Sequence, residues 1–256
     1  MTYQQLLKTA GKVAMTDKIE VLELDGKAWK LFDKSFPKAS VFYEAMLQTL
    51  AEGTGLNVPQ IYGIEQVDER FAIVSQYIEG KTVAQLMEEK PAMADEYIGL
   101  MVEQQLRIHS KNVHDVKKLK HQLERKIKAA PYIDDIKKYE LLTRLASMPE
   151  HNKLCHGNFG PENVILDGLD NVYIIDWVAA TRGNAAADAA KTYLKLTLVR
   201  TESAEEYLRL FCEKTGTARN YVQEWLPIMA AAYLTERNLT EREKAVMLTW
   251  LDVVDY

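Results

Sequence analysis

The stretch of sequence that decides the fold lies at residues 156–166, which read HGNFGPENVIL, and continues at residues 174–177, which read IIDW. The first part is a polar turn followed by an apolar run, and the second is an apolar strand that ends on an acidic residue. Catalytic groups usually sit on loops that are held in place by strands. The stretch therefore predicts a functional loop in which a histidine, two asparagines and an aspartate flank two short strands.

Two side chains of this stretch carry oxygen atoms suited to a hard cation. Asp176 has a charged carboxylate and Asn163 has a neutral amide carbonyl, and Mg²⁺ prefers oxygen ligands of both kinds. Phosphoryl transfer needs few reacting side chains, but it needs cations that neutralise phosphate and a group that positions the acceptor. The pair is therefore a candidate magnesium site for phosphoryl transfer.

The chain before this stretch begins with strands and continues with helices. The alternating residues 19–24, the turn Asp25-Gly26 and residues 27–32 predict a β-hairpin. A helix at 41–50 with Ser40 as its cap is expected next. The other expected elements are strands at 61–67 and 71–78, helices at 83–90, 93–109, 116–129 and 133–148, strands at 164–166 and 172–175, and helices from 185 onward.

This order of elements predicts an α+β protein with two lobes. A β-rich first third is followed by a mostly helical remainder, and the two are linked near residues 79–81. We expect a small N-terminal lobe at residues 1–80 and a larger helical lobe at residues 81–256.

Composition limits the possible classes of protein. The chain has 256 residues, a formal net charge of -5 and two cysteines. This charge gives no reason to expect a nucleic-acid partner, and two cysteines are too few for a disulfide framework. Residues 1–8 lack the apolar run of a signal peptide, and the apolar stretch at 225–234 is too short to span a bilayer. We therefore expect a soluble cytoplasmic protein with no membrane partner.

The central stretch resembles the catalytic loop and metal-binding segment of the aminoglycoside phosphotransferase and choline kinase-like family, whose members have a protein-kinase-like fold. The family pattern reads His-Gly-Asp-x-x-x-x-Asn, followed by an apolar run and an aspartate. His156, Gly157, Asn163, Asp176 and Trp177 match it. The resemblance implies that Asn163 and Asp176 bind Mg²⁺ and that the catalytic loop contains His156 in a mostly structural role. Farther along, Gly183 and Asp188 match a segment whose aspartate braces the catalytic loop.

The N-terminal third agrees with this resemblance. Lys30 matches the lysine that holds the α- and β-phosphates of ATP, and Glu44 on the next helix matches its ion-pair partner. Gln76 and Ile78 fall where the hinge that holds adenine would lie. The resemblance thus implies a small-molecule kinase that uses ATP and Mg²⁺ and phosphorylates a hydroxyl group.

Asn158 departs from the family pattern, because it stands where the family has its catalytic aspartate. An amide cannot act as a general base, and general acid–base help is typically worth about 10²–10⁴-fold. Residues 11–14 also carry a single glycine where a glycine-rich phosphate-covering loop is expected.

Three explanations of Asn158 are open at this level. The chain is a small-molecule phosphotransferase whose acceptor is positioned by another carboxylate, or a catalytically impaired nucleotide-binding pseudokinase with a regulatory or interaction role. Alternatively, Asn158 is an engineered inactivating substitution.

The acceptor itself is not encoded in any motif. Glu236, Glu241 and Glu243 suit a cationic substrate, but an exposed acidic helix explains them equally well. The segment 111–128 is rich in lysine, and its apolar residues recur at helical spacing. Its lysines therefore form either a solvated helix face or a patch for an anionic partner.

Overall fold

The computed structural model describes residues 2–236 and 238–252. The chain divides into two compact units. The first, here called the sheet unit, contains the residues up to Gln85 together with residues 162–178. The second, here called the helical unit, contains residues 86–161 and the residues from Ala179 onward. The segment 162–178, which the sequence analysis assigned to the helical lobe, thus groups with the strands of the N-terminal third.

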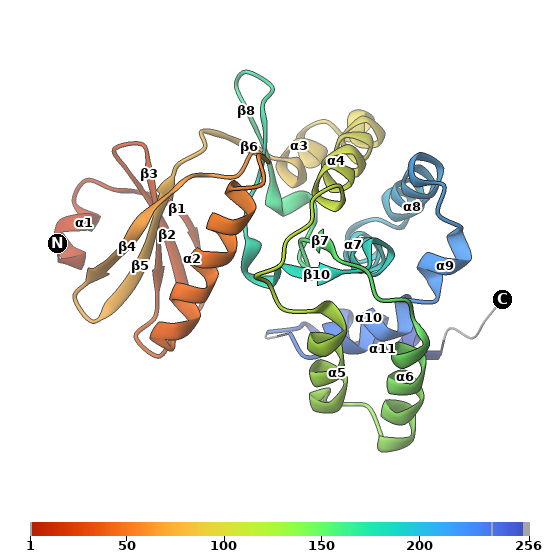
Figure 1. Cartoon of the computed structure of the whole chain (residues 1–256). Coiled ribbons are helices and arrows are strands. Elements are labelled where there is room, and N and C mark those ends of the chain that lie inside the picture. The colour runs from red at the N-terminus through yellow and green to blue at the C-terminus, as the bar shows by residue number, and fades with distance from the viewer. Residues whose placement is uncertain (1, 237, 253–256) are drawn as a thin grey trace. The chain divides into compact units, whose positions relative to one another are not determined.

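The sheet unit is built on a five-stranded antiparallel sheet with the strand order β1-β2-β3-β5-β4, along which one long helix runs (Figure 1). Its elements are α1 (Tyr3–Leu7), β1 (Gly11–Met15), β2 (Ile19–Leu24), β3 (Lys27–Phe32), α2 (Lys38–Glu52), β4 (Ile61–Val67) and β5 (Arg70–Gln76).

Helices cover both faces of this sheet. Successive side chains of a strand point to opposite faces, so neighbouring residues of β3 contact different helices. Leu31 packs with Leu6 of α1 on one face. The next residue, Phe32, packs with Val41 of α2 on the other face. Lys30 lies two positions before Phe32 and therefore points toward the same face as α2. This alternation brings the lysine within reach of the helix that follows it in the chain.

A smaller three-stranded sheet completes the sheet unit. Its strand order is β6-β8-β9, and Gly80 opens β6. A Cβ atom on Gly80 would lie 2.1 Å from the carbonyl oxygen of Leu166 on β8, so a larger residue would push these strands apart. The elements are β6 (Gly80–Thr82), the 3-10 helix η2 (Pro161–Asn163), β8 (Val164–Asp167), β9 (Val172–Ile174) and the 3-10 helix η3 (Trp177–Ala179).

The helical unit contains the remaining elements and one short two-stranded sheet, β7-β10. Helix α7 is lined by buried alanines, which allow close packing of its neighbours. The elements are α3 (Val83–Glu89, at the boundary of the units), η1 (Pro91–Met93), α4 (Ala94–His109), α5 (Leu119–Ala129), α6 (Asp135–Ser147), β7 (Lys153–Cys155), β10 (Thr181–Gly183), α7 (Ala185–Val199), α8 (Thr201–Thr215), α9 (Arg219–Gln223), α10 (Leu226–Tyr233), α11 (Glu241–Thr249) and η4 (Trp250–Asp252).

The predicted α+β class is confirmed, and two local expectations are wrong. Ser40 does not cap α2, because the helix begins at Lys38 after Pro37. Residues 11–14 are not a phosphate-covering loop but belong to β1, which pairs with β2. Within residues 2–236 and 238–252, no helix combines the length and the apolar character needed to cross a membrane.

Candidate active site

Three charged side chains from distant parts of the sequence meet in the sheet unit. Lys30 Nζ on β3 lies 2.5 Å from Glu44 Oε1 on α2. The same ammonium lies 3.2 Å from Asp176 Oδ1, which follows β9. The structure therefore brings together the candidate phosphate-binding lysine, its predicted ion-pair partner and one candidate metal ligand.

Asp176 is held in an unusual backbone conformation directly after its strand. Its φ angle is 64°, in the left-handed region. Residues other than glycine adopt this region at a cost, and such residues cluster at functional sites. The next residue, Trp177, fixes the turn, because its side chain is fully buried and donates a hydrogen bond from Nε1 to Ile174 O at 3.0 Å.

The second candidate metal ligand is placed beside the same turn. Ile175 N donates a hydrogen bond to Asn163 O at 3.0 Å, which continues the pairing of β8 with β9. Asn163 is 6% exposed. The hairpin therefore holds Asn163 and Asp176 at one end of the small sheet, although they are separated in sequence.

The cluster keeps its lysine charged. Burial lowers the pKa of Lys30, but the negative charges of Asp176 and Glu44 outweigh this effect, so its pKa lies above the ordinary value. Burial raises the pKa of Glu44, and the charge of Lys30 offsets part of that rise. A fixed, protonated ammonium between two acidic groups can neutralise the charge of a phosphate.

The oxygen atoms in this corner suit a magnesium ion. Asp176 supplies a carboxylate and Asn163 an amide carbonyl, both of which are hard donors. Mg²⁺ is usually bound in proteins through one or two such groups, with phosphate oxygens and water completing its coordination. The donor set therefore fits a magnesium ion that is shared with a nucleotide.

Gln76 and Ile78 lie where β5 leaves the large sheet. Gln76 N already donates a hydrogen bond to Gln60 O at 2.8 Å, and Ile78 is 8% exposed. An adenine at this position would therefore meet the carbonyl group of Gln76 or the backbone of Ile78, but not the Gln76 amide.

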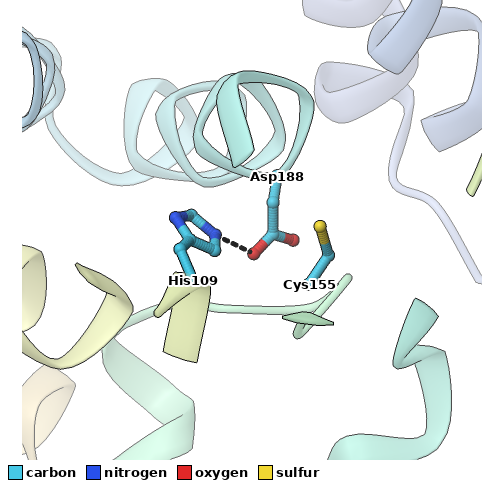
Figure 2. Close-up of side chains that lie close together, drawn as sticks. All are labelled: His109, Cys155 and Asp188. Carbon is cyan, nitrogen blue, oxygen red and sulfur yellow. Dashed lines mark hydrogen bonds and ion pairs between the residues drawn. The ribbon is translucent and has the colours of Figure 1, made fainter. Parts of the chain in front are cut away.

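The loop at residues 156–158 belongs to the helical unit and is held by Asp188 of α7. Oδ1 of Asp188 accepts a hydrogen bond from Gly157 N at 2.8 Å, and Oδ2 accepts one from His156 N at 3.1 Å. Oδ2 also lies 3.0 Å from His109 Nε2 and 3.2 Å from Gln105 Nε2. Figure 2 shows His109 and Asp188 facing each other. Asp188 is thus a buried brace for the loop.

The same brace places a thiol beside the carboxylate. The ligating atoms of His109, Cys155 and Asp188 all lie within 4.8 Å of one another (Figure 2). Metal binding by cysteine requires the thiolate, but burial and the charge of Asp188 raise the pKa of the Cys155 thiol well above its ordinary value. Because both oxygens of Asp188 already accept backbone hydrogen bonds, the cluster is suited to holding the loop rather than a metal.

The predicted catalytic residues occupy this braced loop. His156 is fully buried, and its Nδ1 accepts a hydrogen bond from Asn158 N at 3.2 Å. The side chain of Asn158 is half-buried, and its Oδ1 lies 3.0 Å from Lys195 Nζ on α7. Lys195 Nζ also donates to Asn158 O at 3.1 Å.

Lys195 is a site residue that sequence reasoning missed. The sequence signal was its position four residues after Lys191 on one face of the predicted helix. Periodicity alone could not tell which loop that face meets.

The acidic residues considered for a cationic substrate have other partners. Glu236 Oε1 lies 2.5 Å from Lys191 Nζ. Glu241 pairs with Lys244, and Glu243 closes the capping box of α11 with Thr240. These contacts favour a structural role for all three carboxylates.

Comparison with known proteins assigns the chain to a family. The family model described as "Phosphotransferase enzyme family" matches residues 28–225. The chain belongs to this family of phosphotransferases. The match spans Lys30, the braced loop and Asp176, so it includes the residues on which the resemblance was based. No curated protein matches the sequence of this phosphotransferase family member.

Solved structures share the fold of this family member over nearly its whole length. The choline kinase LicA from Streptococcus pneumoniae is 16% identical, with a TM-score of 0.66 over 97% of this chain and 95% of that chain. A thermostable mutant of the aminoglycoside phosphotransferase APH(4)-Ia, crystallised with AMP-PNP and hygromycin B, is 15% identical, with a TM-score of 0.67 over 95% and 92% of the two chains. An aminoglycoside-3'-phosphotransferase of type VIII is 15% identical, with a TM-score of 0.62 over 94% and 92%.

Proposed function

We propose that this protein transfers the γ-phosphoryl group of ATP to a hydroxyl group of a small molecule, with Mg²⁺ as its cofactor. The observation that carries the proposal is the meeting of Lys30 with Glu44 and Asp176. These groups come from three separate segments, and kinases use a lysine–glutamate ion pair together with an aspartate that holds Mg²⁺ to bind the nucleotide and its metal. Structural neighbours crystallised with AMP-PNP and AMP support nucleotide binding.

Each site residue has a role in this proposal. Lys30 holds the α- and β-phosphates, and Glu44 keeps its ammonium in place. Asp176 and Asn163 hold the magnesium ion, which neutralises the charge of the phosphate oxygens when bound. Gln76 and Ile78 contact the adenine.

The braced loop serves the acceptor. His156 holds the backbone of Asn158, and the amide of Asn158 orients the acceptor hydroxyl without removing its proton. Both cysteines are unpaired, as is usual in a reducing compartment. We therefore place the reaction in the cytoplasm, and we divide the work between a nucleotide-binding lobe at 1–80 and a catalytic lobe at 81–256.

A second candidate function rests on Asn158. Its side-chain oxygen is engaged by the ammonium of Lys195, so this position holds neither a base nor a free acceptor. Under this candidate the protein binds Mg²⁺ and ATP without transferring phosphate, and it acts through a partner.

The binding site is tested by the melting temperature. We expect Mg²⁺ and ATP together to raise it, and either one alone to have little effect, because a ligand stabilises the state that binds it. Lys30→Met should abolish the shift and weaken nucleotide affinity about tenfold or more, since a charge-assisted contact is lost. Lys27→Met, on the exposed end of the same strand, is the control and should retain the shift. A shift that survives Lys30→Met would contradict the assigned site. Turnover of ATP with an acceptor would separate the two candidate functions, because only the phosphotransferase converts ATP to ADP.

A further inference from the structure

A small cavity lies next to the braced loop inside the helical unit. It is walled by α5, Gly157, β10, α7 and α10, and it is here called the α5 cavity. Its volume is about 40 Å³, which exceeds the 10–15 Å³ or so that one water needs by this measure. The cavity is large enough for one small polar group but not for a whole sugar. Gly157 in its wall immediately precedes Asn158, so a group bound here would lie beside the proposed acceptor loop.

Lys126 brings an uncompensated charge to this cavity. It lines the wall from α5 and is half-buried. Among the described residues, none accepts a hydrogen bond or forms an ion pair with its Nζ. Burial and the neighbouring charges of Lys191 and Arg125 lower the pKa of Lys126 to about 8, against the opposing effect of Glu236. A half-buried ammonium without a partner is costly, and an anion in the cavity would remove that cost.

A second polar group in the cavity also lacks a partner. Thr181 of β10 lines the wall and is 2% exposed. Its hydroxyl oxygen is buried and has no hydrogen-bond partner within the described part of the chain. Buried hydroxyl groups are normally satisfied. The Thr181 hydroxyl is therefore a donor available to an oxygen atom in the cavity.

The other charges around the cavity are engaged with one another or with the loop, which leaves Lys126 as the charge without a close partner among the described residues. Lys191 lines the wall and pairs with Glu236. Asp188 also lines it, but its oxygens hold the loop. The charges of Lys126, Lys191 and Lys195 all act to lower the pKa of Glu236, despite its burial. Three ammonium groups thus act on Glu236, while the charge of Asp188 is taken up by the loop amides and His109.

We propose that the α5 cavity binds a carboxylate or phosphate group of the acceptor, so that the substrate is an anionic hydroxyl compound. The acceptor part of this inference rests on the proposed function. Lys126 and Thr181 contact the anionic group, and Lys191 adds positive charge. The arrangement disfavours a cationic group in the cavity, because its charge would face Lys126, while Asp188 and Glu236 are already engaged by the loop and by Lys191.

The anion site is tested by isothermal titration with inorganic phosphate and with acetate, which separate the two kinds of anionic group. Binding of at least one probe is expected, and Lys126→Met should weaken it about tenfold or more. Lys128→Met, at an exposed position on the same helix, is the matched control and should bind like the parent. Thr181→Val should also weaken binding, because it removes the hydroxyl but keeps the shape.

A melting experiment separates this role from a structural one. Lys126→Met removes an unpaired half-buried charge and should leave the melting temperature unchanged or raise it. Weaker anion binding without lower stability is the expected combination. Absence of binding by both probes, or equal affinities of Lys126→Met and Lys128→Met, would overturn the proposal.

The acceptor class is tested with matched pairs that differ by one anionic group. Serine should bind more tightly than ethanolamine, and glycerol 3-phosphate more tightly than glycerol, and Lys126→Met should abolish both differences. Tighter binding of the ethanolamine or glycerol member would overturn the assignment. These titrations need neither nucleotide nor turnover, so their failure is distinguishable from failure of the Mg²⁺–ATP melting shift.

Discussion

Asn158 carries an amide at the position where related phosphotransferases are expected to use a carboxylate. Its Oδ1 lies 3.0 Å from Lys195 Nζ, so the side-chain oxygen faces a cation. A carboxylate in the same place would pair with this lysine and would still be able to accept a proton or hydrogen bond from an acceptor. Under the proposed function, this residue would decide whether the loop only orients a hydroxyl group or also activates it.

We expect Asn158→Asp to increase phosphoryl transfer to the best acceptor by about 10²–10⁴-fold, the usual contribution of a general base. The measurement is the initial rate of ADP formation at saturating Mg²⁺ and ATP. Asn220→Asp, at an exposed position in α9, is the control for the added charge. An unchanged rate despite intact nucleotide binding would show that position 158 does not limit catalysis and would favour the nucleotide-binding candidate.

At the scale of elements, the braced loop depends on one glycine. Gly157 has a φ angle of 74°, and a Cβ atom there would lie 2.2 Å from Ala179 O. A side chain would be strained by its backbone and would also push the loop away from Ala179 at the end of η3. The loop can therefore keep its place between Asp188 and residue 179 only with glycine at this position.

We predict that Gly157→Ala lowers the free energy of unfolding by about 1–3 kcal/mol, from backbone strain and the close contact. Gly99→Ala is a control of opposite sign. Gly99 lies inside α4 with open space around its Cα, so alanine should stabilise the helix by about 0.5–1 kcal/mol. Urea unfolding of both variants measures the difference, and equal effects would contradict the strained-loop argument.

At the scale of the whole molecule, stability should depend on the charge of Asp188. Burial raises the pKa of Asp188, but the hydrogen bond and charge of His109, the charge of His156 and the Gly157 amide outweigh it and lower the pKa to about 2. The ordinary value is 3.8. A depressed pKa in the folded state contributes stability at pH values above the unfolded pKa, and this contribution disappears as the pH falls through the folded pKa.

The free energy of unfolding of the parent should therefore fall as the pH decreases from about 4 to about 2. Asp188→Asn should be less stable than the parent at pH 7, and the difference should shrink over the same acidic range. Chemical unfolding at several pH values measures both quantities, with Asp115→Asn at an exposed position as the control. A difference that stays constant down to pH 2 would show that the carboxylate does not act through its charge.

Much of the fold could be predicted from local sequence. The hairpin at 19–24 and 27–32 has the predicted bounds, because alternation and an Asp-Gly turn are local signals. The helix after it was expected, but its start was not, since Ser40 caps nothing and α2 begins at Lys38. The family resemblance led us to expect a phosphate-covering loop at residues 11–14, where the sequence has a single glycine. These residues instead form β1 and pair with β2, a contact that the resemblance did not indicate.

The sequence by itself determined the family and the α+β, protein-kinase-like fold class, and it predicted the candidate phosphate-site residues, because these depend on residue types and spacings along the chain. Only the tertiary structure decided that Lys30 lies between Glu44 and Asp176, and that Lys195 reaches Asn158. It also decided that Lys126 and Thr181 face one cavity, where neither has a partner among the described residues. Such contacts join residues far apart in sequence, and their geometry depends on how helices and strands pack, which no local pattern encodes.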